Sequence, residues 1–282
     1  MSPLHLCDWE EAKSVLGGLH SHIFRGLRDP KWKLESLLER QPWVKQFRGF
    51  EKPIHCGFIV GAYEDNRDNY LATFCEAEPM HTDSKEATDD ELWAQGRHYG
   101  LITPFLDWTK NWRVAAFFAL SDWVGWIQRL DGGDDPNTGV VKQREAKNPN
   151  ACVWALALKP SPFAEGEFRF IETIPESESF RKRQAAQEGV YTQILTGRHF
   201  DVEAYLQQSG KIHYLRQYLI PGCRARQALN ELSDEGIDYA RLFPDPGGCA
   251  KHSNFLSLVR GFGESLSAMT ERVERFRART HH

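Results

Sequence analysis

The spacings that mark metal sites and disulfide frameworks are missing from this chain of 282 residues. Its six cysteines are scattered, no C-x-x-C pair occurs, and its histidines lack the spacing of zinc ligands. The sequence therefore predicts neither a bound metal nor a set of disulfides. Cysteines used in this way are typical of a protein in a reducing compartment.

Long apolar runs and several enzyme motifs are missing as well. No run approaches the length of about 18 apolar residues that suggests a membrane span, and residues 1–13 lack a basic-then-apolar signal pattern. We therefore expect a cytoplasmic protein without a membrane partner. The absence of G-x-x-x-x-G-K-[ST], G-x-G-x-x-G, G-x-S-x-G and H-E-x-x-H disfavours P-loop, Rossmann, hydrolase-elbow and zincin chemistry.

What is present is an ordinary globular composition with an uneven distribution of charge. The net charge of −4 argues against a generic polyanion-binding surface. Residues 61–95 carry ten acidic and two basic side chains, whereas residues 181–226 carry eight basic and three acidic ones. Such an acidic and a basic segment would steer an anionic ligand to one face, or they are two solvated surfaces of opposite charge.

The hydrophobic pattern predicts strands interspersed with helices. Helices are expected over 8–16, 33–39, 89–100, 110–128, 176–187, 201–207, 224–232 and 248–277. Strands are expected over 20–24, 151–158, 190–195 and 211–219, with an extended piece at 239–243. Because the order lacks a strict βαβ rhythm, we predict an α+β fold with a mixed, mostly antiparallel central sheet flanked by helices. Residues 1–282 are expected to form one domain, with an acidic inserted lobe at 61–95 and a C-terminal helix within 248–282.

Arg25-Gly26 follows a short apolar stretch and is the first candidate for an anion site. A guanidinium can bind a phosphate through two parallel N–H bonds, and a glycine lets a ligand approach the backbone. The alternative is an ordinary surface arginine at a turn. A second Phe-Arg-Gly at 47–49 lacks a preceding apolar strand and is interpreted as coincidence.

Asp107 and Thr109 stand just before an apolar helix in the stretch 97–119. In that position they would place oxygen acceptors and backbone N–H groups at the positive end of the helix, an arrangement that binds anions. His98 and Tyr99 precede them in the same block. Structural explanations exist for each, with Asp107 and Thr109 as helix caps and His98 as a core histidine.

Arg183 and Gln187 are the third candidate element. They are four residues apart and therefore share one face of a helix. Gly189 then turns the chain and Tyr191 lies in the following strand. Glu188 is the nearest acidic residue to this element, and a solvated basic helix face is the alternative interpretation.

Together these elements resemble the FRG domain family, which is named for an N-terminal Phe/Tyr-Arg-Gly. One departure is Phe105, where the family typically carries arginine, and another is the gap between Gln95 and His98, which the family more often joins. The resemblance covers most of the chain in six ordered blocks: Ile23-Phe24-Arg25-Gly26, Gln95-x-x-His98-Tyr99-Gly100-Leu101, Thr103-x-x-Leu106-Asp107-Trp108-Thr109 with Val114-Ala115-x-Phe117-Phe118-Ala119, Val153-Trp154, Arg183-x-x-x-Gln187-x-Gly189-x-Tyr191, and Gly236-Ile237-x-x-x-x-Leu242-Phe243-Pro244-Asp245.

The resemblance implies a bacterial protein associated with toxin–antitoxin or phage-defence genes. A further likeness is to ADP-ribosyltransferases, which place an Arg-Gly at the end of their first strand to hold the pyrophosphate of NAD and rely on a later acidic residue. This likeness implies NAD as co-substrate and two sets of site residues. The catalytic candidates are Arg25, Asp107 and Glu188, and the NAD-binding candidates are Arg25, Gly26, His98, Tyr99, Thr109, Arg183 and Gln187.

Two functions stay open at this point, and the enzyme is favoured. The first is an NAD-dependent ADP-ribosyltransferase, a toxin or defence effector that modifies a macromolecule, with nucleic acid as a target class and an antitoxin protein as a partner. The second is a non-catalytic sensor or nucleic-acid-binding module that holds a phosphate in the same pocket. A nuclease is disfavoured because no acid pair with metal-site spacing is visible.

Overall fold

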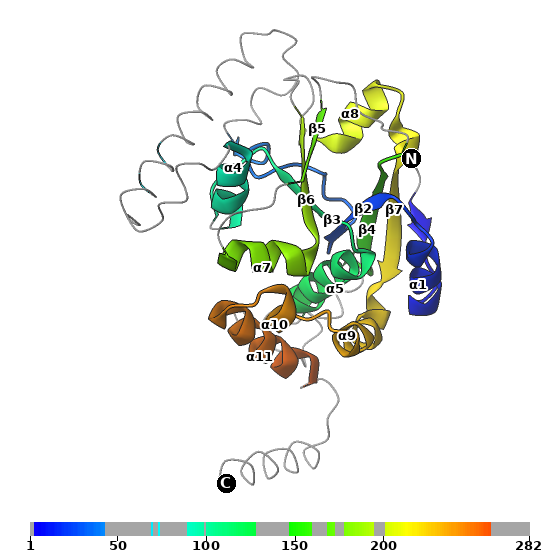
Figure 1. Ribbon diagram of the computed structural model, residues 1–282. Helices are drawn as coiled ribbons and strands as arrows, with labels where there is room; N and C mark the ends of the chain where they lie inside the picture. The colour runs from blue at the N-terminus through cyan, green and yellow to red at the C-terminus, as the bar shows by residue number, and fades with distance from the viewer. Residues whose placement is uncertain are drawn as a thin grey trace, which may run out of the picture.

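Figure 1 shows the computed structural model of the chain, which has the predicted α+β architecture. The structure describes residues 3–42, 69, 73, 89–98, 100–127, 147–159, 168–172, 178–194 and 201–260. These residues form a seven-stranded sheet in the order β1-β7-β4-β2-β3-β6-β5. The strands are β1 (Leu4–His5), β2 (His22–Leu27), β3 (Leu106–Thr109), β4 (Asn150–Ala157), β5 (Phe168–Ile171), β6 (Gly189–Ile194) and β7 (Leu215–Pro221).

The sheet is mostly antiparallel, as predicted. Only β1 and β7 run parallel among the paired strands of the described residues. Strand β4 is central and pairs along its length with β2 on one side and β7 on the other. Its side chains from Ala151 to Leu156 are buried, which explains why its sequence is apolar without alternation.

Helices cover both faces of the sheet (Figure 1). One core cluster joins the sheet to α1, α5 and α9, and a second joins the opposite face to α8. Within the described ranges, no helix is long and apolar enough to span a bilayer. The helices are α1 (Trp9–Gly17), α4 (Asp89–His98), α5 (Trp112–Ile127), α7 (Glu178–Gln187), α8 (Val202–Gln208), α9 (Ala225–Asp234), α10 (Tyr239–Leu242) and α11 (Pro246–Arg260), with short 3₁₀ turns η2 (Ile212–Tyr214) and η3 (Gly222–Arg224).

Helix α5 is the centre of the packing because it is apolar on nearly every side. Figure 1 shows it between the sheet and the layer of α9, α10 and α11. A helix that is hydrophobic all round is stable only when it is covered on all sides, and most of α5 is buried. Strand β2 approaches this helix so closely that a Cβ on Gly26 would lie 1.8 Å from the carbonyl oxygen of Ala115.

Several sequence predictions were wrong in detail. Strand β2 extends to Leu27, so that Arg25-Gly26 lies inside the strand and not at its exit. No helix forms over 33–39, because the Leu34 carbonyl accepts from the N–H of Val202 and the N–H of Leu38 donates to Thr103, which takes the backbone away from helical bonds. The extended piece expected at 239–243 is the short helix α10.

Other predicted elements were confirmed to within a few residues, including α1, α4, α7, α8, α9, β4 and β6. The strand expected over 211–219 begins with η2 and continues as β7. Much of the predicted acidic lobe at 61–95 lies outside the described residues, as do 128–146 and the part of the predicted C-terminal helix beyond 260.

Gly26 gives a direct test of this packing. Gly26→Ala should lower the free energy of unfolding by about 3 kcal/mol, because the added methyl group meets backbone atoms that cannot move aside independently. Gly125→Ala is the matched control within α5, where a Cβ meets nothing within 4 Å, and it should raise stability by about 1 kcal/mol. Urea unfolding followed by circular dichroism measures both, and equal stability of the two variants would contradict the close approach.

Candidate functional site

A cavity of about 530 Å³ opens where strands β2 and β3 part. The two strands pair at a single position, Phe24 opposite Thr109. Continuing that register would place Asp107 opposite Gly26, but no such pair forms between these strands. The cavity is lined by both strands and by parts of α5, α7, β6 and α10. Its volume lies in the range of small-molecule sites.

Arg25 fills the gap between the parted strands. Its Nη1 donates to the backbone carbonyl of Asp107 at 2.5 Å, in place of the hydrogen bonds that the β2–β3 ladder lacks beyond Phe24. The same nitrogen lies 3.5 Å from Oδ2 of Asp107, and the Arg25 side chain is 15% exposed. This arginine therefore supports the sheet and faces the cavity at once.

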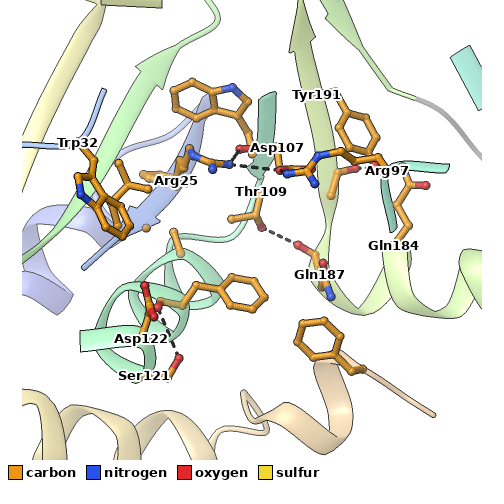
Figure 2. Close-up of a pocket in the computed structure, with 18 of the residues that line it drawn as sticks. Arg25, Trp32, Arg97, Asp107, Thr109, Ser121, Asp122, Gln184, Gln187 and Tyr191 are labelled. Atoms are coloured by element: carbon orange, nitrogen blue, oxygen red, sulfur yellow. Dashed lines mark hydrogen bonds and ion pairs between the residues drawn. The ribbon is translucent and has the colours of Figure 1, made fainter. Parts of the chain in front are cut away.

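Arg97 on α4 reaches the same carboxylate from the other side. Its Nη2 donates to Oδ2 of Asp107 at 2.6 Å. Figure 2 shows the two guanidinium groups pointing toward Asp107 from opposite directions. Asp107 thus holds two arginines that are 72 residues apart in the sequence.

Arg40 is a third guanidinium in the cavity lining. Burial lowers the pKa of Arg25 to about 10, the charge of Asp107 opposes that shift, and the like charges of Arg40 and Arg97 add to it. Burial and the proximity of Arg97 also lower the pKa of Arg40. With a pKa of about 10, Arg25 stays charged at neutral pH. The lining therefore holds three guanidinium groups, Arg25, Arg40 and Arg97, and the carboxylates of Asp107 and Asp122.

Glu39, beside Arg40, does little to offset this positive charge at neutral pH. Burial raises the pKa of Glu39 to about 8, against the opposing effect of its hydrogen bonds with Ser36. Its Oε2 accepts from the N–H of Ser36 at 2.6 Å, while the Ser36 hydroxyl accepts from the N–H of Glu39 at 3.3 Å. Glu35 and Asp107 are the other carboxylates that act on Arg40.

Two of the arginines that line the cavity have a buried N–H donor that makes no hydrogen bond within the described part of the chain. Among the described residues, the Nε atoms of Arg25 and Arg97 are buried without a hydrogen-bond partner. Both atoms are shielded from solvent, so they indicate close packing around the two guanidinium groups.

Thr109 has a structural role that differs from the predicted one. Residues 106–109 form strand β3, not a turn into a helix, so neither Asp107 nor Thr109 caps α5. The cap is Asn111, whose Oδ1 accepts from the N–H of Arg113 at 3.0 Å. The Thr109 hydroxyl accepts from the N–H of Asn111 at 3.0 Å and donates to the carbonyl of Gln187 at 2.7 Å (Figure 2).

Gly26 lines the cavity, but its contact with α5 is the observed reason for a glycine there. Gln187 also lines the cavity, and its Nε2 donates to the carbonyl of Leu242 at 2.9 Å. Arg183 lies outside the lining and stacks on Phe243, with Cζ 4.4 Å from the ring centroid. Phe243 in turn lines the cavity, so that Arg183 positions a wall of the site.

Glu188 is turned away from the cavity lining. Its backbone is left-handed, with φ of 46°, and its Oε1 accepts from Nδ2 of Asn111 at 2.8 Å. The carbonyl of Glu188 accepts from the N–H of Lys110 at 3.0 Å. The structure therefore does not bring Glu188 together with Arg25 and Asp107. The side chains of His98 and Tyr99 lie outside the described residues.

The lining residues that sequence reasoning missed include Trp32, Arg40, Arg97 and Asp122. Arg97 could have been found most easily, because it adjoins His98 and begins the stretch 97–119. At Phe105, where the resemblance leads one to expect arginine, the ring is buried against Tyr191 with centroids 5.4 Å apart. The second guanidinium at Asp107 comes from Arg97.

Comparison with known families supports the resemblance for the part of the chain that builds the charged site. Residues 20–123 match the FRG domain. This range contains all four charged groups just described: Arg25, Arg40, Arg97 and Asp107. Neither the curated proteins nor the solved structures gave a match. The similarity to the FRG domain is therefore shown over residues 20–123, and the motif blocks beyond residue 123 stay a prediction.

Removal of the Thr109 hydroxyl should loosen the junction of β3, α5 and α7. Thr109→Val keeps the shape but leaves the N–H of Asn111 and the carbonyl of Gln187 without this partner, which should cost about 1–3 kcal/mol. Thr109→Ser retains the hydroxyl and should stay within about 1 kcal/mol of the wild type. Calorimetric melting of the three proteins measures the difference, and an equal loss in Thr109→Ser, which keeps the hydroxyl, would contradict a specific role of the hydroxyl.

Proposed function

We propose that the cavity binds a nucleotide through its phosphates, and that this nucleotide is NAD, the donor of ADP-ribose to a macromolecular target. The observation that carries the proposal is the convergence of Arg25 and Arg97 on Asp107, with Arg40 beside them in a 530 Å³ cavity. Three guanidinium groups can neutralise a pyrophosphate. A volume of this size accommodates a ligand larger than a free phosphate.

In the proposed reaction, the bond between ribose C1′ and the nicotinamide nitrogen breaks, and its electron pair leaves with nicotinamide. A nucleophile on the target forms the new bond to C1′ and loses its proton. The sugar passes through an oxocarbenium-like state, which a carboxylate stabilises electrostatically. Asp107 is the candidate for that carboxylate, because it lines the cavity and Glu188 does not.

A specific observation supports a second candidate function, a non-catalytic phosphate-binding module. The Asp107 carboxylate is held by Arg97 at 2.6 Å and approached by Arg25 at 3.5 Å, so that its charge is largely neutralised. A neutralised carboxylate stabilises a developing cation poorly. In that case the protein senses a phosphorylated ligand without consuming it. The proposed transferase would act as a toxin or defence effector, with nucleic acid as a target class and an antitoxin protein as a partner.

The phosphate site is tested by the affinity for pyrophosphate and NAD at fixed ionic strength. Arg97→Gln removes one charge-assisted donor, which should cost about 1.5–3 kcal/mol and hence weaken both ligands roughly 10- to 100-fold. Arg113→Gln is the matched control, because it also breaks an ion pair of 2.6 Å, with Glu235, but lies outside the cavity lining. Isothermal titration calorimetry in which neither ligand binds the wild type would overturn the proposal.

The enzyme and the binding module are separated by following NAD itself. Purified protein is incubated with labelled NAD and total RNA, DNA and protein, and both label transfer and nicotinamide release are measured. The transferase should release nicotinamide, and Asp107→Asn should abolish the release. Binding of NAD by calorimetry without release or transfer would instead establish the non-catalytic module.

A further inference from the structure

We propose that the end of the cavity formed by Trp32 and Asp122 binds a nucleobase that carries an exocyclic amine. This inference rests on the proposed phosphate site, because it assigns the other end of the same ligand. Figure 2 shows Trp32 and Asp122 on one side of Arg25, and Arg97 and Tyr191 on the other. Adenine, cytosine and guanine carry such an amine, so the ligand class that follows is a nucleotide of one of these bases.

Trp32 is the aromatic platform of this subsite. Its side chain is 38% exposed, and among the described residues only Leu4 is another large apolar side chain classed as exposed. Unlike Leu4, Trp32 lines the cavity. Leaving an indole in contact with water costs free energy, whereas stacking a flat base on it recovers part of that cost.

The turn that carries Trp32 is held firmly before any ligand binds. The N–H of Trp32 donates to the carbonyl of Asp29 at 3.1 Å, and the Asp29 side chain accepts from the N–H of Lys31 at 2.9 Å. Pro30 restricts the backbone between them, and its carbonyl accepts from Nε2 of Gln217 at 2.7 Å. A platform fixed in this way loses little entropy on binding.

Arg28 places Asp122 beside the platform. The Arg28 guanidinium lies over the Trp32 ring, with Cζ 4.5 Å from the centroid, and its Nη1 donates to Oδ1 of Asp122 at 3.3 Å. Asp122 lines the cavity and its side chain is 43% exposed. The indole and the carboxylate are therefore joined through one guanidinium, and Asp122 keeps a second oxygen, Oδ2, for a ligand.

A carboxylate beside an aromatic platform selects the base chemically. Ionised aspartate only accepts hydrogen bonds, so it favours an exocyclic amine and repels a carbonyl oxygen at the same place. Figure 2 shows Trp32 and Arg97 on opposite sides of Arg25, and all three line the same cavity. A ligand with a base at one end and phosphates at the other, such as a nucleoside diphosphate, matches this arrangement.

The test is the affinity of the full chain for ADP, IDP and inorganic pyrophosphate, measured by isothermal titration calorimetry. IDP carries a carbonyl where ADP carries the amine. The wild type should bind ADP about tenfold more tightly than IDP, and Asp122→Asn should remove that preference because an amide also donates. Trp32→Ala should weaken ADP roughly 5- to 100-fold and leave pyrophosphate unchanged. Leu4→Ala is the control for loss of an exposed apolar side chain.

The outcomes separate this inference from the phosphate site. If pyrophosphate does not bind but Trp32→Ala weakens ADP, the phosphate site is wrong and the base site stands. If pyrophosphate and ADP bind equally and Trp32→Ala alters neither, the base site is wrong and the phosphate site stands. Equal affinity for ADP and IDP in the wild type would overturn the role of Asp122. Weaker pyrophosphate binding in Trp32→Ala would contradict a base-specific role of Trp32.

Discussion

The hydrogen bond from Arg25 to the Asp107 carbonyl is the interaction on which the site depends. It spans the gap where β2 and β3 no longer pair, so that a side chain replaces a missing part of the ladder. Removing the guanidinium would leave a backbone carbonyl without this donor at the edge of a cavity. The sheet thus has a cationic group built into its middle, and the cavity exists because the strands part there.

The close packing of α5 on β2 forms another boundary of the cavity. Because Gly26 admits the helix backbone so closely, residues of α5 form part of the cavity wall beside β2. Phe118, Ser121 and Asp122 of α5 then face the same cavity as Arg25. Helix α5 is mostly apolar, yet its polar residues Ser121 and Asp122 line the cavity.

Much of the fold could be predicted from the sequence, because periodicity and glycine positions mark the elements directly. The apolar run at β4 and the acidic start of α4 are examples. The site was harder, because its arginines share one carboxylate through contacts that no local pattern records. Asp107 and Thr109 resembled helix caps by position, yet tertiary pairing with β6 made them strand residues. The motifs pointed to Arg25, Gly26, Asp107, Thr109 and Gln187, which line the cavity, but not to Arg40 or Arg97.

The contacts that build the site join distant parts of the chain. Arg25 and Asp107 are 82 residues apart, Thr109 and Gln187 are 78 apart, and Pro30 and Gln217 are 187 apart. Contacts of such separation form late and make folding slow, since long loops must close before any of them is gained. The arginine cluster is therefore a property of the complete native state. A ligand that binds only this native cluster would stabilise the chain against unfolding, and above its Kd the gain would rise with the logarithm of the ligand concentration.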